Sequence, residues 1–318
     1  MSAPVLQVRD LRVYYQTKRG PARAVDGVTF DLQPRERFGL VGESGSGKST
    51  TGLAILRLIK PPGRIESGEV LLDGKNLLST SEEEMRQVRL ALIALVAQGA
   101  MNSLNPVMRI RDQIIDGLID HQAKGTRREF EERVGDLLER VGLQRDVANR
   151  FPHELSGGMK QRVCIAIAIS LHPRIIIADE PTSALDVVVQ RQVMATLQSA
   201  QEDIGAAVIL IGHDMGLMAQ FVERLGVMYA GELVEVSPVE DIFEEPLHPY
   251  TKLLIECLPS LEVKSDLEGI PGLPPSLLGR PTGCPFHPRC PMKMDRCQVE
   301  QPMLKEVAPR RWVACHLY

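Results

Sequence analysis

Apolar and polar residues follow two different patterns along this chain. Nearly unbroken apolar runs predict strands buried in a parallel sheet, at Arg174–Asp179 and Ala207–Ile211. Stretches in which polar residues interleave with Val, Leu, Phe and Tyr predict half-exposed strands over residues 5–15 and 25–33. Apolar positions near a 3.6-residue period predict mostly helix over residues 107–142. An apolar helix closed by Pro173 is predicted over residues 160–171, and a further helix over residues 187–204. Strands that alternate with helices predict an α/β fold with a mostly parallel sheet.

A glycine-rich segment lies between a predicted strand at residues 37–41 and a predicted helix at residues 51–59. It fits the pattern G-x-x-x-x-G-K-[ST] from Gly42 to Ser49, in the strand–loop–helix context that phosphate binding needs. Its N–H groups and the helix N-terminus would face an anion, Lys48 would reach the β and γ phosphates, and Ser49 would hold Mg²⁺. The predicted nucleotide contacts are Gly42, Ser44, Gly45, Gly47, Lys48, Ser49 and Thr50. The alternative, a Gly/Ser-rich turn before an ordinary helix, does not explain why every fixed position matches.

Two further segments carry candidate chemistry. Asp179 ends the isoleucine-rich strand, where a phosphate-loop enzyme holds Mg²⁺, and Glu180 could deprotonate a water molecule. The alternative is a solvated acidic pair that opens a turn. Ser156 could cap the next helix, with Gly157 and Gly158 leaving backbone N–H groups open to an anion. A capped helix with a flexible entry explains the same residues equally well.

The segments Leu155–Arg162, Asp179–Asp186 and His213-Asp214 have the order and spacing of motifs in ATP-binding cassette (ABC) ATPases. On this basis the chain resembles that family over roughly residues 5–240. This resemblance implies a P-loop NTPase (RecA-like) core with a mostly parallel sheet, an antiparallel β subdomain and an inserted helical subdomain at about 99–165. It implies a nucleotide-binding domain over residues 1–236 and a Pro- and Cys-rich C-terminal extension over residues 237–318.

The same resemblance assigns roles to single residues. Gln98 is implied to sense the γ-phosphate and Mg²⁺, and His213 to contact the γ-phosphate. Tyr15 would stack on adenine, although the adjacent Tyr14 is an alternative and either residue could be a core aromatic. In a head-to-tail pair of cassettes, Ser156, Gly157 and Gly158 would face the partner's ATP. Asp186 lies in the implied interface loop, and its alternative role is to cap a helix.

Three other segments narrow the resemblance to oligopeptide and dipeptide importer ATPases: Gln98–Pro106, Pro246–Leu254 and Gly283–Pro291. It implies an ATP-hydrolysing subunit that powers peptide uptake. The implied partners are a second, different ABC ATPase subunit, two integral-membrane permease subunits and an extracytoplasmic substrate-binding protein. The implied location is peripheral, on the cytoplasmic face of the cell membrane. Relatives with the same tail import nickel or oligosaccharides, so these substrates remain alternatives.

Composition excludes some rival functions. The net charge of −4 gives no basic excess for nucleic acid, so no nucleic-acid partner is expected. No apolar run approaches the roughly 20 residues that cross a bilayer, and the N-terminus does not resemble a signal peptide. A soluble, non-transport ABC ATPase is the runner-up. A nucleotide-binding module without turnover is a weaker rival, since Lys48, Asp179, Glu180 and His213 are all present.

Four of the six cysteines lie in the last 35 residues, spaced C-x5-C-x6-C-x17-C at Cys284, Cys290, Cys297 and Cys315. Four thiolates can hold a [4Fe–4S] cluster or a tetrahedral Zn²⁺ ion, and the peptide-importer resemblance implies the cluster. Free thiols remain the third alternative, and His287 and His316 are possible substitute ligands. Cys164 and Cys257 are predicted to be packing residues. Of the 22 prolines, 13 lie from Pro238 onward, which predicts a separate appendage with little regular structure.

Overall fold

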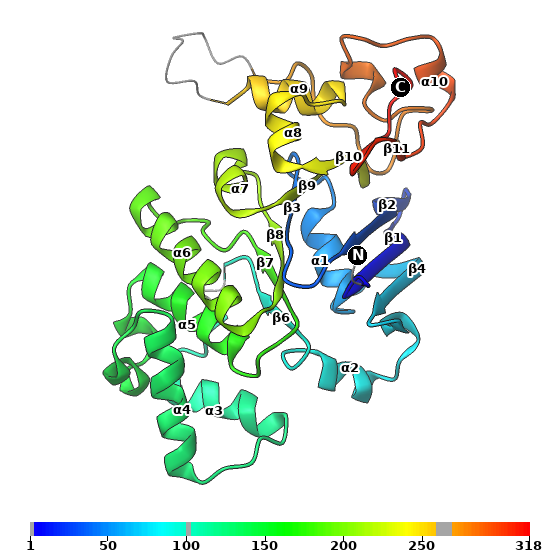
Figure 1. Cartoon of the computed structure of the whole chain (residues 1–318). Coiled ribbons are helices and arrows are strands. Elements are labelled where there is room, and N and C mark those ends of the chain that lie inside the picture. The colour runs from blue at the N-terminus through cyan, green and yellow to red at the C-terminus, as the bar shows by residue number, and fades with distance from the viewer. Residues whose placement is uncertain (1–2, 100–102, 259–268) are drawn as a thin grey trace. The chain divides into compact units, whose positions relative to one another are not determined.

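A computed structural model describes residues 3–99, 103–258 and 269–318 (Figure 1). The chain forms two compact units. The helical unit comprises Met1–Val5, Leu32–Glu36 and Ser79–Leu210. The phosphate-loop unit comprises Leu6–Asp31, Arg37–Leu78 and Ile211–Tyr318.

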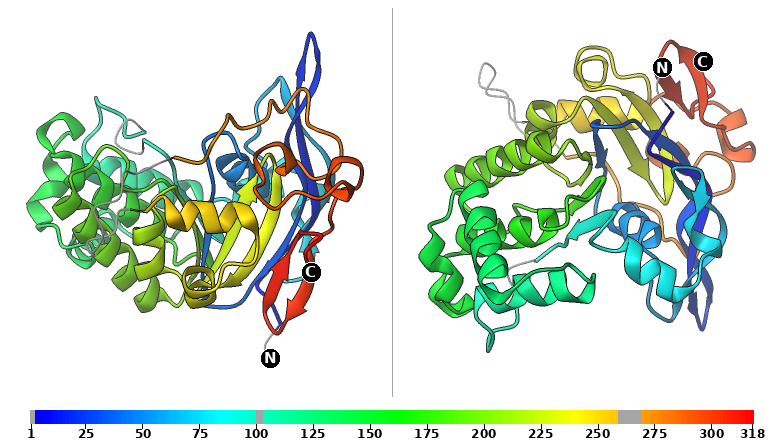
Figure 2. Two further views of the ribbon diagram at one scale, coloured as in Figure 1. Left: turned by 90° about the horizontal axis from the view of Figure 1, so that it is seen from above. Right: turned by 60° about the horizontal axis from the view of Figure 1, so that its bottom comes forward.

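Nine strands lie in the described part of the phosphate-loop unit. They are β1 (Leu6–Thr17), β2 (Gly20–Leu32), β3 (Arg37–Val41), β4 (Gly63–Leu72), β5 (Lys75–Asn76), β9 (Arg224–Tyr229), β10 (Glu232–Pro238), β11 (Lys305–Ala308) and β12 (Arg311–Val313). One antiparallel sheet has the order β2-β1-β4-β5, and β1 and β2 form its long hairpin (Figure 2). In a second sheet β3 pairs with β9 in parallel, and β10, β12 and β11 follow in antiparallel pairing. An antiparallel β subdomain and a phosphate-loop strand at residues 37–41 were both predicted.

The helices of this unit are short. They are α1 (Lys48–Ile55), α7 (Met215–Phe221), α8 (Val239–Glu244), α9 (Pro249–Glu256) and α10 (Arg296–Val299). The helix predicted up to residue 59 ends at Ile55, because Arg57 adopts a left-handed conformation with φ 53°. Leu58 N–H then donates to Leu53 O at 2.8 Å, which closes the helix end in the manner of a Schellman motif.

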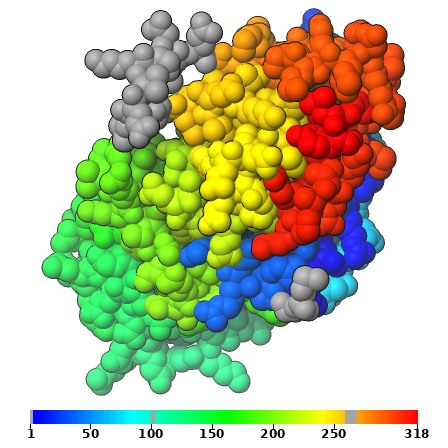
Figure 3. All heavy atoms as spheres, turned by 45° about the horizontal axis from the view of Figure 1, so that its top comes forward, coloured from blue at the N-terminus to red at the C-terminus, as the bar shows by residue number. Residues whose placement is uncertain are grey.

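The C-terminal tail differs from the separate appendage that the prolines predicted. Strand β12 pairs with β10, with Trp312 opposite Val236, so the tail extends the sheet that contains β3. Phe286 is fully buried, edge-on to Tyr229 at a centroid distance of 5.1 Å. The C-terminal residues, orange to red, lie against the yellow residues of α8, α9 and β10 (Figure 3). The tail therefore shares a core with the phosphate-loop strands, although residues 269–286 contain neither helix nor strand, as predicted.

In the residues of the helical unit that the structure describes there are three strands and five α-helices. They are α2 (Glu82–Val88), β6 (Ile93–Val96), α3 (Ile110–Asp120), α4 (Arg127–Arg140), α5 (Gly157–Ile169), β7 (Ile175–Asp179), α6 (Val187–Ile204) and β8 (Ala207–Ile211). The order β8-β7-β6 holds, with β6 parallel to β7. Every residue of β7 and β8 is buried, as expected for apolar strands in a parallel sheet. Strand β6 was not predicted, although its apolar run was visible in the sequence.

Candidate functional site

The predicted phosphate loop joins the end of β3 to the start of α1. Lys48 is only 6% exposed, and its ammonium group turns back into the loop. Lys48 Nζ donates to Gly42 O at 2.8 Å and to Glu43 O at 3.0 Å. The positive charge is therefore held within the loop, where an anion bound by the loop's N–H groups would meet it.

Two glycines in this loop occupy positions that no larger residue could take. Gly47 has φ 105°, and a Cβ atom there would lie 2.3 Å from Ala24 O. A Cβ atom at Gly42 would lie 2.1 Å from Met228 O. Both contacts are with backbone atoms, which cannot turn aside as a side chain can. The loop can therefore follow this path only with glycine at both positions, which fits the predicted binding of ATP phosphates.

In the helical unit, two predicted site residues come together at the end of β7. Gln98 Nε2 donates to Glu180 Oε2 at 2.7 Å. Glu180 has φ 44°, a left-handed conformation that is uncommon for residues other than glycine. Asp179, the last residue of β7, is 6% exposed. Their oxygen atoms are suitable Mg²⁺ ligands, and their roles in catalysis stay predictions.

Ser156 and Asp186 both cap helices in the helical unit. Ser156 Oγ accepts the N–H of Met159 at 3.3 Å, at the start of α5. Asp186 Oδ1 accepts the N–H groups of Val188 and Val189 at 3.1 and 3.0 Å, at the start of α6. The capping alternative is thus present for both residues. The predicted contacts of Ser156, Gly157, Gly158 and Asp186 with a partner's nucleotide remain untested.

Other predicted nucleotide contacts belong to the phosphate-loop unit. His213 is exposed. Tyr14 and Tyr15 differ in their surroundings: the Tyr14 hydroxyl donates to Asp26 Oδ1 at 2.8 Å, whereas Tyr15 lies opposite Gly63 in the sheet. A Cβ atom at Gly63 would lie 2.6 Å from the Tyr15 ring. Gly63 therefore leaves space that the Tyr15 ring fills.

The four cysteines of the last 35 residues line one small cavity. Cys284, Cys290, Cys297 and Cys315 surround it together with His248, Phe286, His287 and His316. Burial above all, together with the neighbouring cysteines, raises the pKa of Cys284 to about 12. Among the described residues, no three His, Cys, Asp or Glu side chains are grouped so that they could hold one metal ion. Residues 100–102 of the importer-like segment Gln98–Pro106 lie outside the described ranges.

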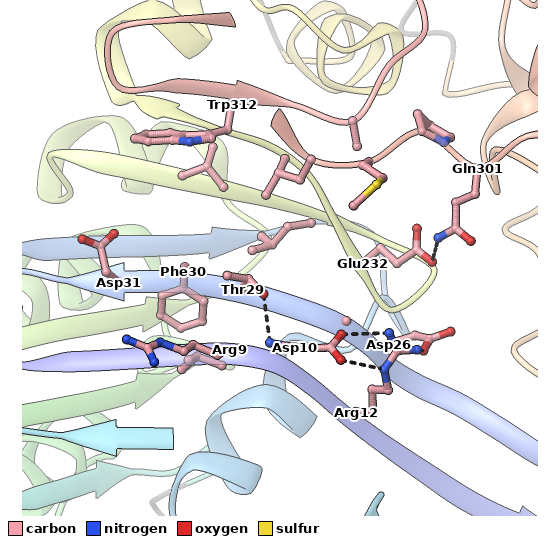
Figure 4. Close-up of a pocket in the computed structure, with 18 of the residues that line it drawn as sticks. Arg9, Asp10, Arg12, Asp26, Thr29, Phe30, Asp31, Glu232, Gln301 and Trp312 are labelled. Atoms are coloured by element: carbon pink, nitrogen blue, oxygen red, sulfur yellow. Dashed lines mark hydrogen bonds and ion pairs between the residues drawn. The ribbon is translucent and has the colours of Figure 1, made fainter. Parts of the chain in front are cut away.

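A larger cavity of about 870 Å³ has no counterpart in the sequence predictions (Figure 4). Strands β1, β2 and β10 and the tail form its walls, and Trp312 lies on its tail side. Asp26 accepts from Arg12 Nη1 at 2.7 Å and from Arg280 Nη1 at 2.7 Å, and Glu232 accepts from Arg280. These charged side chains are partners of one another. We therefore interpret the network as one that fixes the tail to β2 and β10.

A lysine in a glycine-rich loop and an acidic pair at the end of a later strand are features of a nucleotide-binding cassette. The chain belongs to the ABC transporter family, whose pattern matches residues 25–183. The dimeric structure of MJ0796, described as a bacterial ABC transporter cassette, has a TM-score of 0.66 and 28% identity. The match covers 74% of this chain and 98% of the MJ0796 chain. None of the helices in the described ranges is long and apolar enough to cross a membrane.

Within this family the chain resembles a narrower group. Residues 234–297 match the pattern described as "Oligopeptide/dipeptide transporter, C-terminal region". The oligopeptide transport ATP-binding protein AppD of Bacillus subtilis is 42% identical over 318 residues, 99% of this chain and 97% of its own. The dipeptide transport ATP-binding protein DppD of Escherichia coli is 42% identical over 318 residues, 98% of this chain and 96% of its own.

Proposed function

We propose that this protein is the ATP-hydrolysing subunit of an ABC importer that takes up dipeptides or oligopeptides through separate permease subunits. The observation that carries the proposal is the phosphate loop, in which Lys48 is held at Gly42 O and Glu43 O and only glycine fits at positions 42 and 47. The peptide substrate is supported by relatives that are named for peptide transport and are similar along nearly their whole length.

Each site residue then has a chemical role. Bound MgATP supplies the phosphoanhydride bond, and Mg²⁺ offsets the phosphate charge. The N–H groups of the phosphate loop and Lys48 would bind the phosphates, and Ser49, Gln98 and Asp179 would hold Mg²⁺. Glu180 takes a proton from the attacking water, and the hydrogen bond from Gln98 orients its carboxylate. His213 contacts the γ-phosphate and Tyr15 stacks on adenine.

The remaining assignments concern partner proteins. Ser156, Gly157, Gly158 and Asp186 would act on a nucleotide held by a second ABC ATPase subunit, a different paralogue of this chain. Val187 and Val188, beside Asp186, are 65% and 66% exposed, which suits an interface. The pair of ATPases would drive two permease subunits at the cytoplasmic face of the membrane, supplied by an extracytoplasmic substrate-binding protein.

We further propose that Cys284, Cys290, Cys297 and Cys315 hold a [4Fe–4S] cluster, with zinc as the alternative. All four side chains line one cavity, and thiolate sulfur is the ligand that both groups prefer. A single zinc ion requires its sulfur ligands at about 2.3 Å from one point. Among the described side chains no such group is present, so the choice of the cluster over zinc rests on the resemblance to peptide-importer ATPases.

Replacing Glu180 with glutamine tests the catalytic assignment. The amide keeps the shape of the side chain but cannot take a proton, so we expect MgATP to bind and turnover to fall at least about a hundredfold. ATP hydrolysis and nucleotide binding should be measured in complexes co-expressed with the permease genes, with Glu202→Gln on α6 as the control. Near-normal turnover would exclude Glu180 as the base.

The transport and metal proposals need separate measurements. Uptake of labelled dipeptides and oligopeptides should depend on Lys48, whereas uptake of nickel or an oligosaccharide instead would contradict the peptide substrate. Protein purified without oxygen should be brown, with broad absorption near 400 nm and about four irons per chain if the cluster is present. Colourless protein that contains zinc would refute the cluster and support the alternative.

A further inference from the structure

One residue of the phosphate loop, Glu43, is held from three directions. Its N–H donates to Tyr250 Oη at 2.9 Å, and its carbonyl oxygen accepts from Lys48 Nζ at 3.0 Å. Its carboxylate accepts two hydrogen bonds from Arg289, Nη1 to Oε2 at 2.7 Å and Nη2 to Oε1 at 3.0 Å. Two of the three partners, Tyr250 and Arg289, belong to the tail. The tail thus fixes both the backbone and the side chain of a residue next to the phosphate-binding lysine.

Arg289 is itself held rigidly. Its side chain is only 5% exposed, and Nε donates to Pro271 O at 2.9 Å. Nη2 also donates to Ile270 O at 3.2 Å, and Nη1 donates to Tyr229 Oη at 3.3 Å. A guanidinium fork that is fixed by its surroundings forms a two-bond contact with a carboxylate, which a lysine cannot reproduce. The contact with Glu43 is therefore both strong and specific in direction.

The same part of the tail leads to the cysteine cavity. Cys290 follows Arg289 directly in the chain, and Cys284 N–H donates to Cys297 O at 2.8 Å. Phe286, between Cys284 and Arg289 in sequence, packs against Tyr250 with ring centroids 5.3 Å apart. Both tail residues that hold Glu43 are thus in contact with, or adjacent to, the residues that line this cavity.

We propose that Arg289 and Tyr250 are positioning residues for the phosphate loop, and that they couple nucleotide binding to the state of the cysteine cavity. Phosphate affinity depends on several loop N–H groups pointing to one place, and Glu43 lies within that loop. A shift of the Cys284–Cys290 segment moves Arg289 and so changes the conformation of Glu43. If the cavity holds the metal proposed above, ATP would by linkage change the affinity of the cavity for that metal by the same factor.

The first experiment compares two buried arginines of the tail in the full-length protein. Arg289→Gln removes the contact with Glu43, whereas Arg280→Gln removes ion pairs with Asp26 and Glu232 and does not touch the loop. We expect Arg289→Gln to raise the Kd for ATP with Mg²⁺ about tenfold, a common size of coupling. Arg280→Gln should leave this Kd within about twofold. Arg289→Lys, which keeps the charge and loses the fork, serves if the glutamine variant does not fold.

Non-additivity separates positioning from general destabilisation. Glu43→Gln should raise the Kd as much as Arg289→Gln does, and the double variant should raise it no further. Effects that add up, or equal effects of Arg289→Gln and Arg280→Gln, would overturn the positioning role. An unchanged Kd in Arg289→Gln and Arg289→Lys would overturn it as well.

The second experiment tests the coupling to the cavity. Cys290→Ser should raise the Kd for ATP in the native background and have no further effect in the Arg289→Gln background. Cys257→Ser, on a half-buried tail cysteine outside the cavity, is the control. An unchanged Kd in Cys290→Ser, or an equal effect in both backgrounds, would refute the coupling. Protein without metal would refute only the proposed cluster, because the contact between Arg289 and Glu43 contains no metal.

Discussion

Replacing Asp26 with asparagine removes the negative charge on which several tail and sheet residues converge. The Asp26 side chain is 6% exposed, and it accepts from Arg12 at 2.7 Å, from Tyr14 at 2.8 Å and from Arg280 at 2.7 Å. Asparagine has the same shape but no charge. The Arg280 side chain, 12% exposed, would then keep only Glu232 as a charged partner among its described contacts.

The structure sets the expected size of the effect. Removing one partner of a buried ion pair costs about 3–5 kcal/mol, because the other charge stays buried. Arg12 is 37% exposed and can be rehydrated, so we expect about 3 kcal/mol for Asp26→Asn. Asp10 is the matched control: it pairs with the same Arg12 at 2.8 Å but is 63% exposed. Asp10→Asn should cost at most about 1 kcal/mol, as exposed pairs do.

Urea unfolding can be followed by tryptophan fluorescence, because the chain contains one tryptophan and Trp312 lines the same cavity as Asp26 (Figure 4). With a slope of about 2–3 kcal/mol per M, Asp26→Asn should lower the midpoint by about 1 M. The slope itself should stay constant, which shows that stability and not compactness has changed. Equal midpoints for Asp26→Asn and Asp10→Asn would refute the claim that burial of the ion pair determines its contribution.

Three other changes test separate parts of the structure. Gly47→Ala should abolish ATP binding, because the added Cβ would meet Ala24 O. Gly74 also has a positive φ, 83°, but faces open space, so Gly74→Ala should only lower stability slightly. Normal ATP binding by Gly47→Ala would contradict the close approach of Gly47 to Ala24. Ser156→Ala and Thr126→Ala each remove a helix cap and should each lower the free energy of unfolding by about 1 kcal/mol. Only Ser156→Ala should also lower ATP hydrolysis in the assembled complex. Equal ATPase activities of the two variants would assign Ser156 to capping alone. Burial lowers the pKa of His248 to about 3. Between pH 6.5 and 3 the unfolded chain therefore takes up a proton that the folded chain does not, so the free energy of unfolding decreases as the pH is lowered. At pH 5 this effect should lower the free energy of unfolding, measured with urea, by about 2 kcal/mol. His248→Asn keeps an acceptor for Tyr250 N–H and should remove this part of the pH dependence. A variant with the same pH profile as the native protein would refute the role of His248.

Features that depend on neighbouring residues could be predicted from the sequence. The phosphate loop is encoded in consecutive residues, and its strand β3 begins and ends at the predicted positions. The bounds of α6 and β8 were also predicted, because Asp186 caps α6, Gly205 ends it, and the apolar residues 207–211 form a buried strand. The end of α1 was missed, since nothing in the residue type of Arg57 indicates a left-handed conformation.

Contacts between distant segments were decided only by the tertiary structure. The spacing of the tail cysteines suggested a common site, but only folding places Cys284 and Cys315 around one cavity. Arg289 and Glu43 are 246 positions apart, and no local pattern marks either residue as a partner of the other. A short motif can be recognised from consecutive residues, whereas the distance between two charges far apart in the chain is set by the sheet and the aromatic core that lie between them in the fold.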